Sequence, residues 1–258
     1  MNSRGASEVV GSLLTVALIV TAAGLIYMIS QPVISSSVDS VKFRNAVKSM
    51  AEIKELVERM KYGEEIATTK TIQLNGGSIT SAAGGVSVFV PSLPRGLAVV
   101  VPGTPGAYSR GYPIAAQHAA NYYELPLHNL EIEVSGREVV LESGIFIKEF
   151  GRVVPVPVSP PEVVATNDTL YITFFDFSGN LSAGGYKVTL NFRYAGTYFG
   201  NVTYVEIRSE FCQIWKESIA DALRGTRAAT ITYDGCKDEK KIRVEGNVTL
   251  LLTVIEVS

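Results

Sequence analysis

The chain has 258 residues, with 23 Lys and Arg against 25 Asp and Glu, so its formal net charge is −2. A chain this close to charge balance lacks the basic surface that nucleic-acid binding requires, so no nucleic acid is expected among its partners. Hydrophobic residues make up 47% and charged residues 19%, which excludes broad disorder. Two Cys and two His are too few for a zinc cluster of these residues, and we expect no metal or cofactor.

The first part of the sequence contains a long uncharged segment. Thirty consecutive residues, 9–38, carry no charge, and their core, 9–30, is almost entirely apolar. As a helix this core would be roughly 33 Å long, enough to cross a hydrocarbon layer of about 30 Å. A buried helix of a soluble protein would need a polar face, and only Ser and Thr are available here. The segment therefore predicts a membrane-spanning helix.

An ordinary secretory signal peptide is the alternative interpretation of this segment. Its apolar region would be about 7–15 residues long and would end at a small-residue cleavage site. The candidate site, residues 21–24, lies inside the apolar run, and an acid, Glu8, stands at the start of that run. These features favour a segment that stays on the mature protein.

The segment that follows the span is amphipathic. Apolar residues recur at spacings of three and four over residues 43–60, and charged residues take the other face. Pro32 should interrupt or kink the helix, and Gly63 is a C-cap signal. We expect one long helix over about residues 8–61, although an anchor followed by a separate helix would have the same periodicity.

The remaining sequence is typical of a mainly β head. Short β-rich runs alternate with turn signals, and residues 91–126 are rich in Pro, Gly, Ala and Tyr. Residues 210–224 have a helical pattern with one apolar face. The predicted fold class is α+β, a long helix followed by a sandwich-like β domain with one packed helix. The expected strands lie at residues 70–74, 86–90, 97–101, 130–134, 138–141, 170–177, 186–194, 202–207, 227–233, 241–245 and 247–257.

Motifs of known catalytic sites are absent from the sequence, among them H-E-x-x-H, G-x-S-x-G and the P-loop. His118 and His128 have no Cys or acid cluster at ligand spacing and are interpreted as surface histidines. Glu131 and Glu133 share one strand face, which is typical of a solvated surface. We therefore do not expect an enzyme and name no catalytic residue.

The start of the chain resembles the class III signal peptide of archaeal type IV pilins and archaellins. The resemblance rests on Arg4-Gly5-Ala6-Ser7-Glu8 followed by the apolar run. In that family a prepilin peptidase cuts after the Gly on the cytoplasmic side. The apolar helix stays on the mature protein, first in the membrane and later in a filament core. The resemblance implies cleavage between Gly5 and Ala6, and the β-rich head is similar to the heads of archaeal pilin-like surface proteins.

This resemblance divides the chain into a leader, 1–5, a long helix, 6–62, and an extracellular head, 63–258. Glu8 would become the third mature residue, where it could neutralise the new ammonium group at Ala6 in its own or a neighbouring subunit. A first-turn acid also favours the positive end of the helix dipole, and both roles stay open.

Four N-x-[ST] sequons support an external head that carries N-linked glycans. Cys212 and Cys236 are the only cysteines of the chain. Because thiols oxidise outside the cell, we predict a disulfide between them, with two buried free thiols as the alternative. The sequon asparagines are Asn167, Asn180, Asn201 and Asn247.

The expected function is structural, as a subunit or accessory subunit of an archaeal type IV pilus-like filament. Its expected partners are copies of itself or other pilins, the membrane, the prepilin peptidase and the pilus assembly machinery. The chain would be single-pass in the membrane with a cytoplasmic amino end, and would later form part of an extracellular filament. Lys42, Arg44 and Lys48 favour the opposite orientation, but the leader and the sequons carry more weight. The alternative is a monomeric membrane-anchored module that binds glycan or another surface ligand through Tyr108, Tyr112, Tyr122 and Tyr123.

Overall fold

The structure is a computed structural model that describes residues 3–93, 97–99, 112–114, 117–119, 122–149 and 156–258. It forms two compact units, Met1–Arg44 and Asn45–Ser258. Most of the Pro- and Tyr-rich stretch lies outside the described residues.

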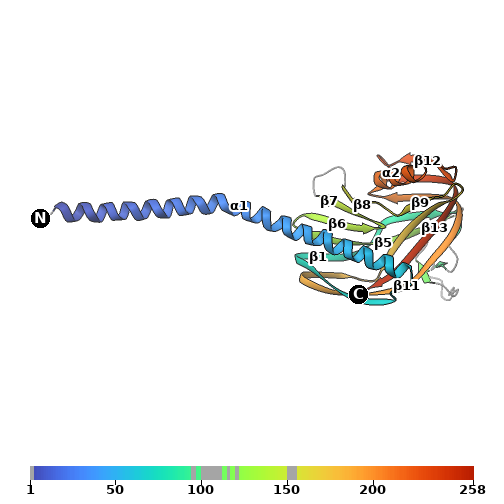
Figure 1. Ribbon diagram of the computed structural model, residues 1–258, viewed down its shortest axis with the longest axis horizontal. Helices are drawn as coiled ribbons and strands as arrows, with labels where there is room; N and C mark the ends of the chain where they lie inside the picture. Colours follow the sequence, from blue (N-terminus) through green and yellow to red (C-terminus); the bar gives the residue numbers. More distant parts are fainter. Residues whose placement is uncertain (1–2, 94–96, 100–111, 115–116, 120–121, 150–155) are drawn as a thin grey trace. The chain divides into compact units, whose positions relative to one another are not determined.

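A single helix, α1 (Ser3–Lys61), has 59 residues (Figure 1). It begins before residue 8, where the start was expected, and Pro32 does not interrupt it. Its end agrees with the sequence: Gly63 has a φ of 76°, and its N–H donates to Met60 O at 2.9 Å. A glycine in this left-handed conformation satisfies a carbonyl of the last turn and stops the helix.

The last part of α1, from Asn45 onward, belongs to the head because one face of it is buried. Polar side chains of this part of α1 also bond to the head. Lys54 Nζ donates to Ser159 Oγ at 2.6 Å, and Lys61 pairs with Glu162 at 2.6 Å. The boundary between the compact units therefore lies within the helix, between Arg44 and Asn45. The buried apolar side chains are Ala46, Met50, Ile53, Leu56, Val57 and Met60.

The head is built on a large sheet with the strand order β8-β7-β6-β5-β1-β11-β13-β10-β9. β12 pairs with β13, β4 pairs with β5, and β2 and β3 form a separate pair. Helix α2 lies between β11 and β12 in the sequence. The elements are β1 (Ala67–Val90), β2 (Leu97–Val99), β3 (Tyr112–Ile114), β4 (Gln117–Ala119), β5 (Tyr122–Val134), β6 (Arg137–Glu142), β7 (Gly144–Glu149), β8 (Val156–Ser159), β9 (Val163–Ala165), β10 (Leu170–Ser178), β11 (Ser182–Ser209), α2 (Cys212–Ala222), β12 (Ala229–Gly235) and β13 (Lys241–Val257).

Several strands that were expected to be separate are joined into long ones. β1, β11 and β13 have 24, 28 and 17 residues because they continue through glycines such as Gly76, Gly196 and Gly246. Asn75 and Gly76 have φ of 51° and 94° inside β1, where the left-handed backbone makes a local irregularity instead of a turn. At Ser135 and Gly136, by contrast, φ of 51° and 73° make a two-residue hairpin between β5 and β6.

The predicted α+β class is confirmed, and the sandwich-like head is made by one sheet that curves back on itself. Side chains join its distant parts: Asp176 Oδ1 of β10 accepts the backbone N–H of His128 of β5 at 2.8 Å. Ser143 Oγ accepts the backbone N–H of Phe175 at 3.1 Å. The bond to Ser143 satisfies the N–H of Phe175 on the edge of β10 beyond its short pairing with β9.

Both faces of the sheet are buried in the centre of the head. Phe174 of β10 stacks on Trp215 of α2 with ring centroids 5.1 Å apart. The next residue, Phe175, is also buried and points to the other face, because successive side chains of a strand alternate. In β6, Val140 belongs to the core that contains Trp215, whereas Val139 is buried outside that core. This arrangement explains the continuous apolar runs of these strands.

Candidate functional site

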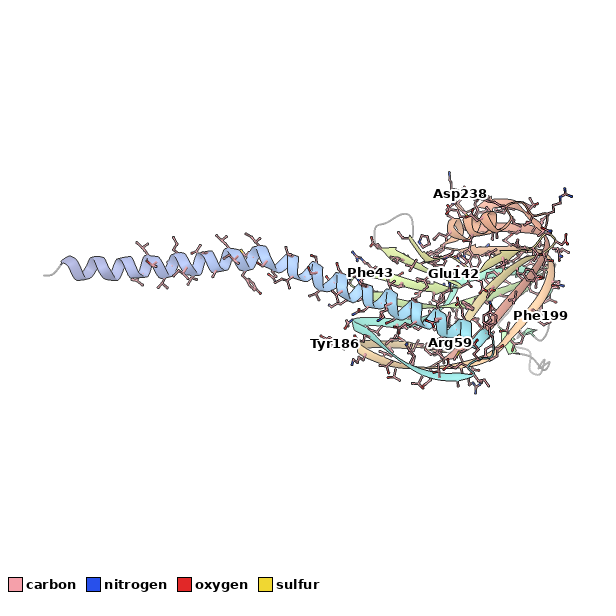
Figure 2. The ribbon with its side chains drawn as sticks, viewed as in Figure 1. Phe43, Arg59, Glu142, Tyr186, Phe199 and Asp238 are labelled. Atoms are coloured by element: carbon pink, nitrogen blue, oxygen red, sulfur yellow. A yellow bond between two sulfur atoms is a disulfide. The ribbon has the colours of Figure 1, made fainter. Side chains whose placement is uncertain are left out.

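The apolar half of α1, residues 13–41, exposes its side chains. The large apolar side chains from Leu13 to Val41 are between 45% and 72% exposed, and they project from both sides of the helix in Figure 2. The helix is long and apolar enough to span a membrane.

Hydroxyl groups of the apolar half bond to the backbone of their own helix. Thr21 Oγ1 donates to Ala17 O at 2.7 Å, and Ser40 Oγ donates to Ser36 O at 2.8 Å. A hydroxyl that is satisfied in this way needs no polar partner from a lipid or from a neighbouring helix. Thr21, Ser36, Ser37 and Ser40 are therefore compatible with an apolar environment.

The predicted cleavage and charge-pairing residues, Gly5, Ala6 and Glu8, lie in the first turns of α1. Their side chains are outside the described part of the structure, so only the backbone places them. In a helix, residues 6 and 8 are about 3 Å apart along the axis. A carboxylate at Glu8 would thus lie in the first turn of a helix that begins at Ala6.

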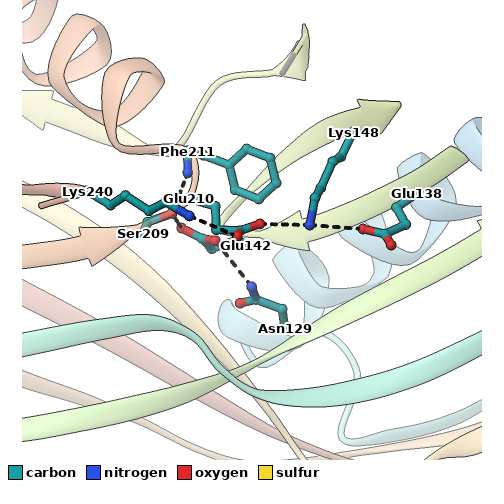
Figure 3. A network of polar contacts seen from close by, with 8 residues as sticks. All are labelled: Asn129, Glu138, Glu142, Lys148, Ser209, Glu210, Phe211 and Lys240. Atoms are coloured by element: carbon teal, nitrogen blue, oxygen red, sulfur yellow. Dashed lines mark hydrogen bonds and ion pairs between the residues drawn. The ribbon is translucent and has the colours of Figure 1, made fainter. Parts of the chain in front are cut away.

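A buried carboxyl group lies in the head, at the end of β6. Glu142 is 1% exposed, and its Oε1 accepts from Ser209 Oγ at 2.6 Å and from Trp215 Nε1 at 2.7 Å. Its Oε2 accepts from Asn129 Nδ2 at 3.2 Å (Figure 3). Burial raises the pKa of Glu142 to about 8, although the three hydrogen bonds act in the opposite direction. The group is therefore mostly protonated at pH 7.

The amide of Asn129 completes this cluster. Its Oδ1 is buried and has no hydrogen-bond partner as the amide is oriented. The orientation of an amide is an assignment, and turning it over would direct its oxygen at Glu142 Oε2. A protonated Glu142 can donate to that oxygen, which agrees with its raised pKa. The cluster therefore joins β5, β6, the end of β11 and α2 through a neutral acid.

Charged groups form a network at the surface beside this cluster. Glu210 bonds to Lys148 at 2.8 Å and to Lys240 at 3.1 Å, and Lys148 is 3.4 Å from Glu138 (Figure 3). The hydrogen bond from Lys148 lowers the pKa of Glu210. The head has open clefts near Thr68 and near Ser92, and neither is lined by Glu142 or by this network. Both groups of residues therefore lie away from these two clefts.

His128 differs from the surface histidine that the sequence suggested. Its Nδ1 lies 2.8 Å from Asp176 Oδ1, and the hydrogen bond to Asp176 raises the pKa of His128. Acid–histidine pairs also orient catalytic bases. In the part of the chain that the structure describes, however, no hydroxyl or thiol bonds to His128, and no group of His, Cys, Asp and Glu could hold a metal. The side chain of His118 lies outside the described residues.

The tyrosines of the proposed binding loop are only partly described. Tyr108 lies outside the described residues, and of Tyr112 the structure places only the backbone. Tyr122 packs edge-on against Phe89 with ring centroids 5.6 Å apart, and Tyr123 packs against the core. Tyr122 and Tyr123 thus have a packing role.

The predicted disulfide between Cys212 and Cys236 is present, with Cα atoms 5.3 Å apart. The four sequon asparagines, Asn167, Asn180, Asn201 and Asn247, are all exposed.

The sequence did not reveal the cluster around Glu142. Its only signal is one acid at the end of an otherwise apolar run, and the partners Asn129, Ser209 and Trp215 are distant in the sequence.

These features define a class of protein in which a long helix with an apolar half carries a β-rich, disulfide-bonded head. The chain belongs to a family of unknown function, DUF7289, whose model matches residues 4–258. An uncharacterized protein of Archaeoglobus fulgidus is 49% identical to it over 266 residues, which cover 100% of this chain and 98% of that protein. No solved structure matches the chain. Both matches extend over the helix and the head together.

Proposed function

We propose that this protein is a structural subunit or accessory subunit of an archaeal type IV pilus-like filament. The observation that carries the proposal is the apolar half of α1, which overlaps the thirty uncharged residues 9–38 and exposes its large apolar side chains. A helix of this kind needs an apolar environment on every side. A bilayer can supply it before assembly, and the helices of other subunits can supply it in a filament.

Packing would drive the assembly. The apolar half contains Gly24, several alanines and hydroxyl residues beside large aliphatic side chains, and small residues let helix backbones approach closely. The hydroxyls of Thr21, Ser36, Ser37 and Ser40 bond to their own backbone and do not oppose transfer between lipid and protein. The heads would form the outer layer of the filament.

Cleavage of the leader would be the step that controls assembly. Cleavage between Gly5 and Ala6 creates an ammonium group two residues before Glu8. A carboxylate at the membrane boundary is costly unless it is paired, so Glu8 would neutralise this ammonium in its own or a neighbouring subunit. As a first-turn acid it would also stabilise the start of the helix by about 0.3–1 kcal/mol.

The direct test is the first residue of the native protein, together with electron microscopy of the cell surface. Mass spectrometry should find a chain that begins at Ala6, and antibodies to the head should label filaments. Gly5→Val should block cleavage, because a branched side chain stands at the bond that is cut, and filaments should be lost. Gly24→Ala is the matched control for cleavage, because it leaves the leader unchanged and should be cut normally. A native chain that begins beyond Ser30 would rule out the pilin function.

The role of Glu8 is tested with Glu8→Gln, which keeps the size of the side chain and removes its charge. The variant should be processed and reach the membrane, but its filament yield should fall at least several-fold. Normal filament yield would show that the pairing role is wrong. Protein that is anchored in the membrane of cells whose filaments never contain it would instead favour the monomeric surface module.

A further inference from the structure

The four sequons of the head are not equivalent, because three of them bond to one another. Asn247 Nδ2 donates to Asp168 O and to Thr169 Oγ1, each at 2.9 Å. Thr249 Oγ1 donates to Asn201 Oδ1 at 2.8 Å. These bonds join the turn before β10 to β13, and β13 to β11. The asparagine and threonine residues of these sequons thus hold strands together.

Asn167 belongs to the same group of residues. It lies in the turn between β9 and β10, where Thr166 and Thr169 bond to each other, and its carbonyl accepts the N–H of Arg227 at 3.2 Å. The hydroxyl that completes its sequon, on Thr169, already accepts from Asn247. A transferase that bound this hydroxyl would have to break the contact with β13.

Asn180 is different. It follows Gly179 in the short connection between β10 and β11, and it is exposed. Within the described residues, neither its amide nor the hydroxyl of Ser182 makes a hydrogen bond. Both groups of this sequon are therefore free, and they lie where β10 has ended and β11 begins. Loops of this kind are the accessible parts of a folded domain.

Asn180 also stands at an open cleft of about 940 Å³. The opposite walls belong to β1, β11 and the end of β13, and they present hydroxyl, amide and charged groups. Arg193 and Glu256 of these walls form an exposed ion pair at 2.7 Å. Such groups can hydrogen-bond to sugar hydroxyls, and the cleft has room for the first sugars of a chain. The other wall residues that matter here are Thr68, Thr69 and Asn191.

We propose that Asn180 is the glycosylated asparagine of the four, and that its oligosaccharide lies in this cleft. In the transfer, Asn180 Nδ2 forms a bond to the anomeric carbon of an oligosaccharide carried on a lipid phosphate. The bond from that carbon to the phosphate oxygen breaks, and the amide proton leaves to a base. The inference depends on the proposed function, because it needs a head that is exported.

Glycopeptide mass spectrometry of the full chain from its native host, or from an archaeal host, tests the choice of sequon. The peptide with Asn180 should carry the glycan mass, and the other three sequons should be bare. Asn180→Gln and Ser182→Ala should each remove the whole mass increment, whereas Asn247→Gln should leave it unchanged. A bare Asn180, or a glycan on another sequon at comparable occupancy, would overturn the inference.

Protease added outside intact cells distinguishes the two proposals. An exposed head with a bare Asn180 would overturn only the glycosylation site. A head that is shielded from the protease would overturn the proposed function and the glycosylation together.

Carboxyl labelling tests where the glycan lies. Glu256 lies in the cleft, pairs with an arginine Nε at 2.7 Å and is 38% exposed. Glu245 is its matched control, because it pairs with an arginine Nε at 2.8 Å and is 45% exposed. Labelling of Glu256 should fall several-fold in the glycosylated protein relative to Asn180→Gln, and labelling of Glu245 should not change. Equal labelling of Glu256 in both proteins would show that the cleft is empty.

Discussion

Glu142 is a buried acid whose charge state affects the stability of the head. Its unfolded pKa is near 4.5, and burial raises its folded pKa to about 8. Between these values the folded state binds more protons than the unfolded state, so the free energy of unfolding falls as pH rises. The slope from this group is up to about 1.4 kcal/mol per pH unit.

Replacing Glu142 by Gln should remove this dependence. The amide oxygen of Gln can accept from Ser209 and Trp215, and its nitrogen can donate to the buried oxygen of Asn129. Urea unfolding at several pH values should therefore show a flatter profile between pH 4.5 and 8. At pH 8 the variant should be more stable than the wild type by roughly 1–3 kcal/mol.

His128 also makes the free energy of unfolding fall as pH rises, both in the wild type and in Glu142→Gln. Its pKa is raised by Asp176, so its contribution to stability is complete below 6.5 and is lost as pH rises through the folded pKa. Identical profiles of wild type and Glu142→Gln would mean that Glu142 is ionised in the folded head.

At the scale of elements, α2 depends on its tertiary contacts. With 11 residues it is too short to be stable alone. Two of its own side chains, Trp215 and Ile219, are fully buried in the core of the head. At its start, Ser209 Oγ accepts the N–H of Phe211. The disulfide then joins its first residue, Cys212, to the segment after β12. These contacts fix both the start and the buried face of the helix.

Reduction of the disulfide should destabilise the head. A bridge over a sequence separation of 24 residues stabilises by about 3 kcal/mol in the chain-entropy model. For a domain of this size the melting temperature should fall by roughly 6–12 °C when a reductant is added. Cys236→Ala should melt at the lower temperature and should not respond to reductant. An unchanged melting temperature of the reduced wild type would exclude a stabilising role for the bridge.

At the scale of the whole molecule, the compact-unit boundary between Arg44 and Asn45 predicts where the chain can be cut. A chain that begins at Asn45 keeps the buried face of α1 and should be a soluble, folded monomer. Its melting temperature should lie within a few degrees of that of the full chain in detergent. Circular dichroism and light scattering measure both properties.

A shorter chain that begins at Tyr62 is the matched control. It lacks the buried apolar side chains of α1, such as Met50, Ile53 and Val57. Each such side chain stabilises by roughly 1.5–3 kcal/mol when buried, and together they approach the total stability of a domain. This chain should therefore not fold. Two equally stable truncations would show that α1 is dispensable to the head.

The sequence by itself determined the features that depend on local signals. The missing charges over residues 9–38 predicted an apolar helix, and Gly63 predicted its end. The strands expected at residues 130–134 and 138–141 are also found, joined by a hairpin at Ser135 and Gly136, where φ is positive. The pairing of the two cysteines followed from their number.

Only the tertiary structure decided the features that depend on residues far apart in the sequence. Nothing near Asn75 and Gly76 indicated that their strand would continue, because pairing with β5 and β11 overrides a local turn preference. The sequence likewise could not show that Glu142 is a neutral acid. Its pKa depends on burial and on donors that come from β5, β11 and α2, and the curvature of the sheet brings these together.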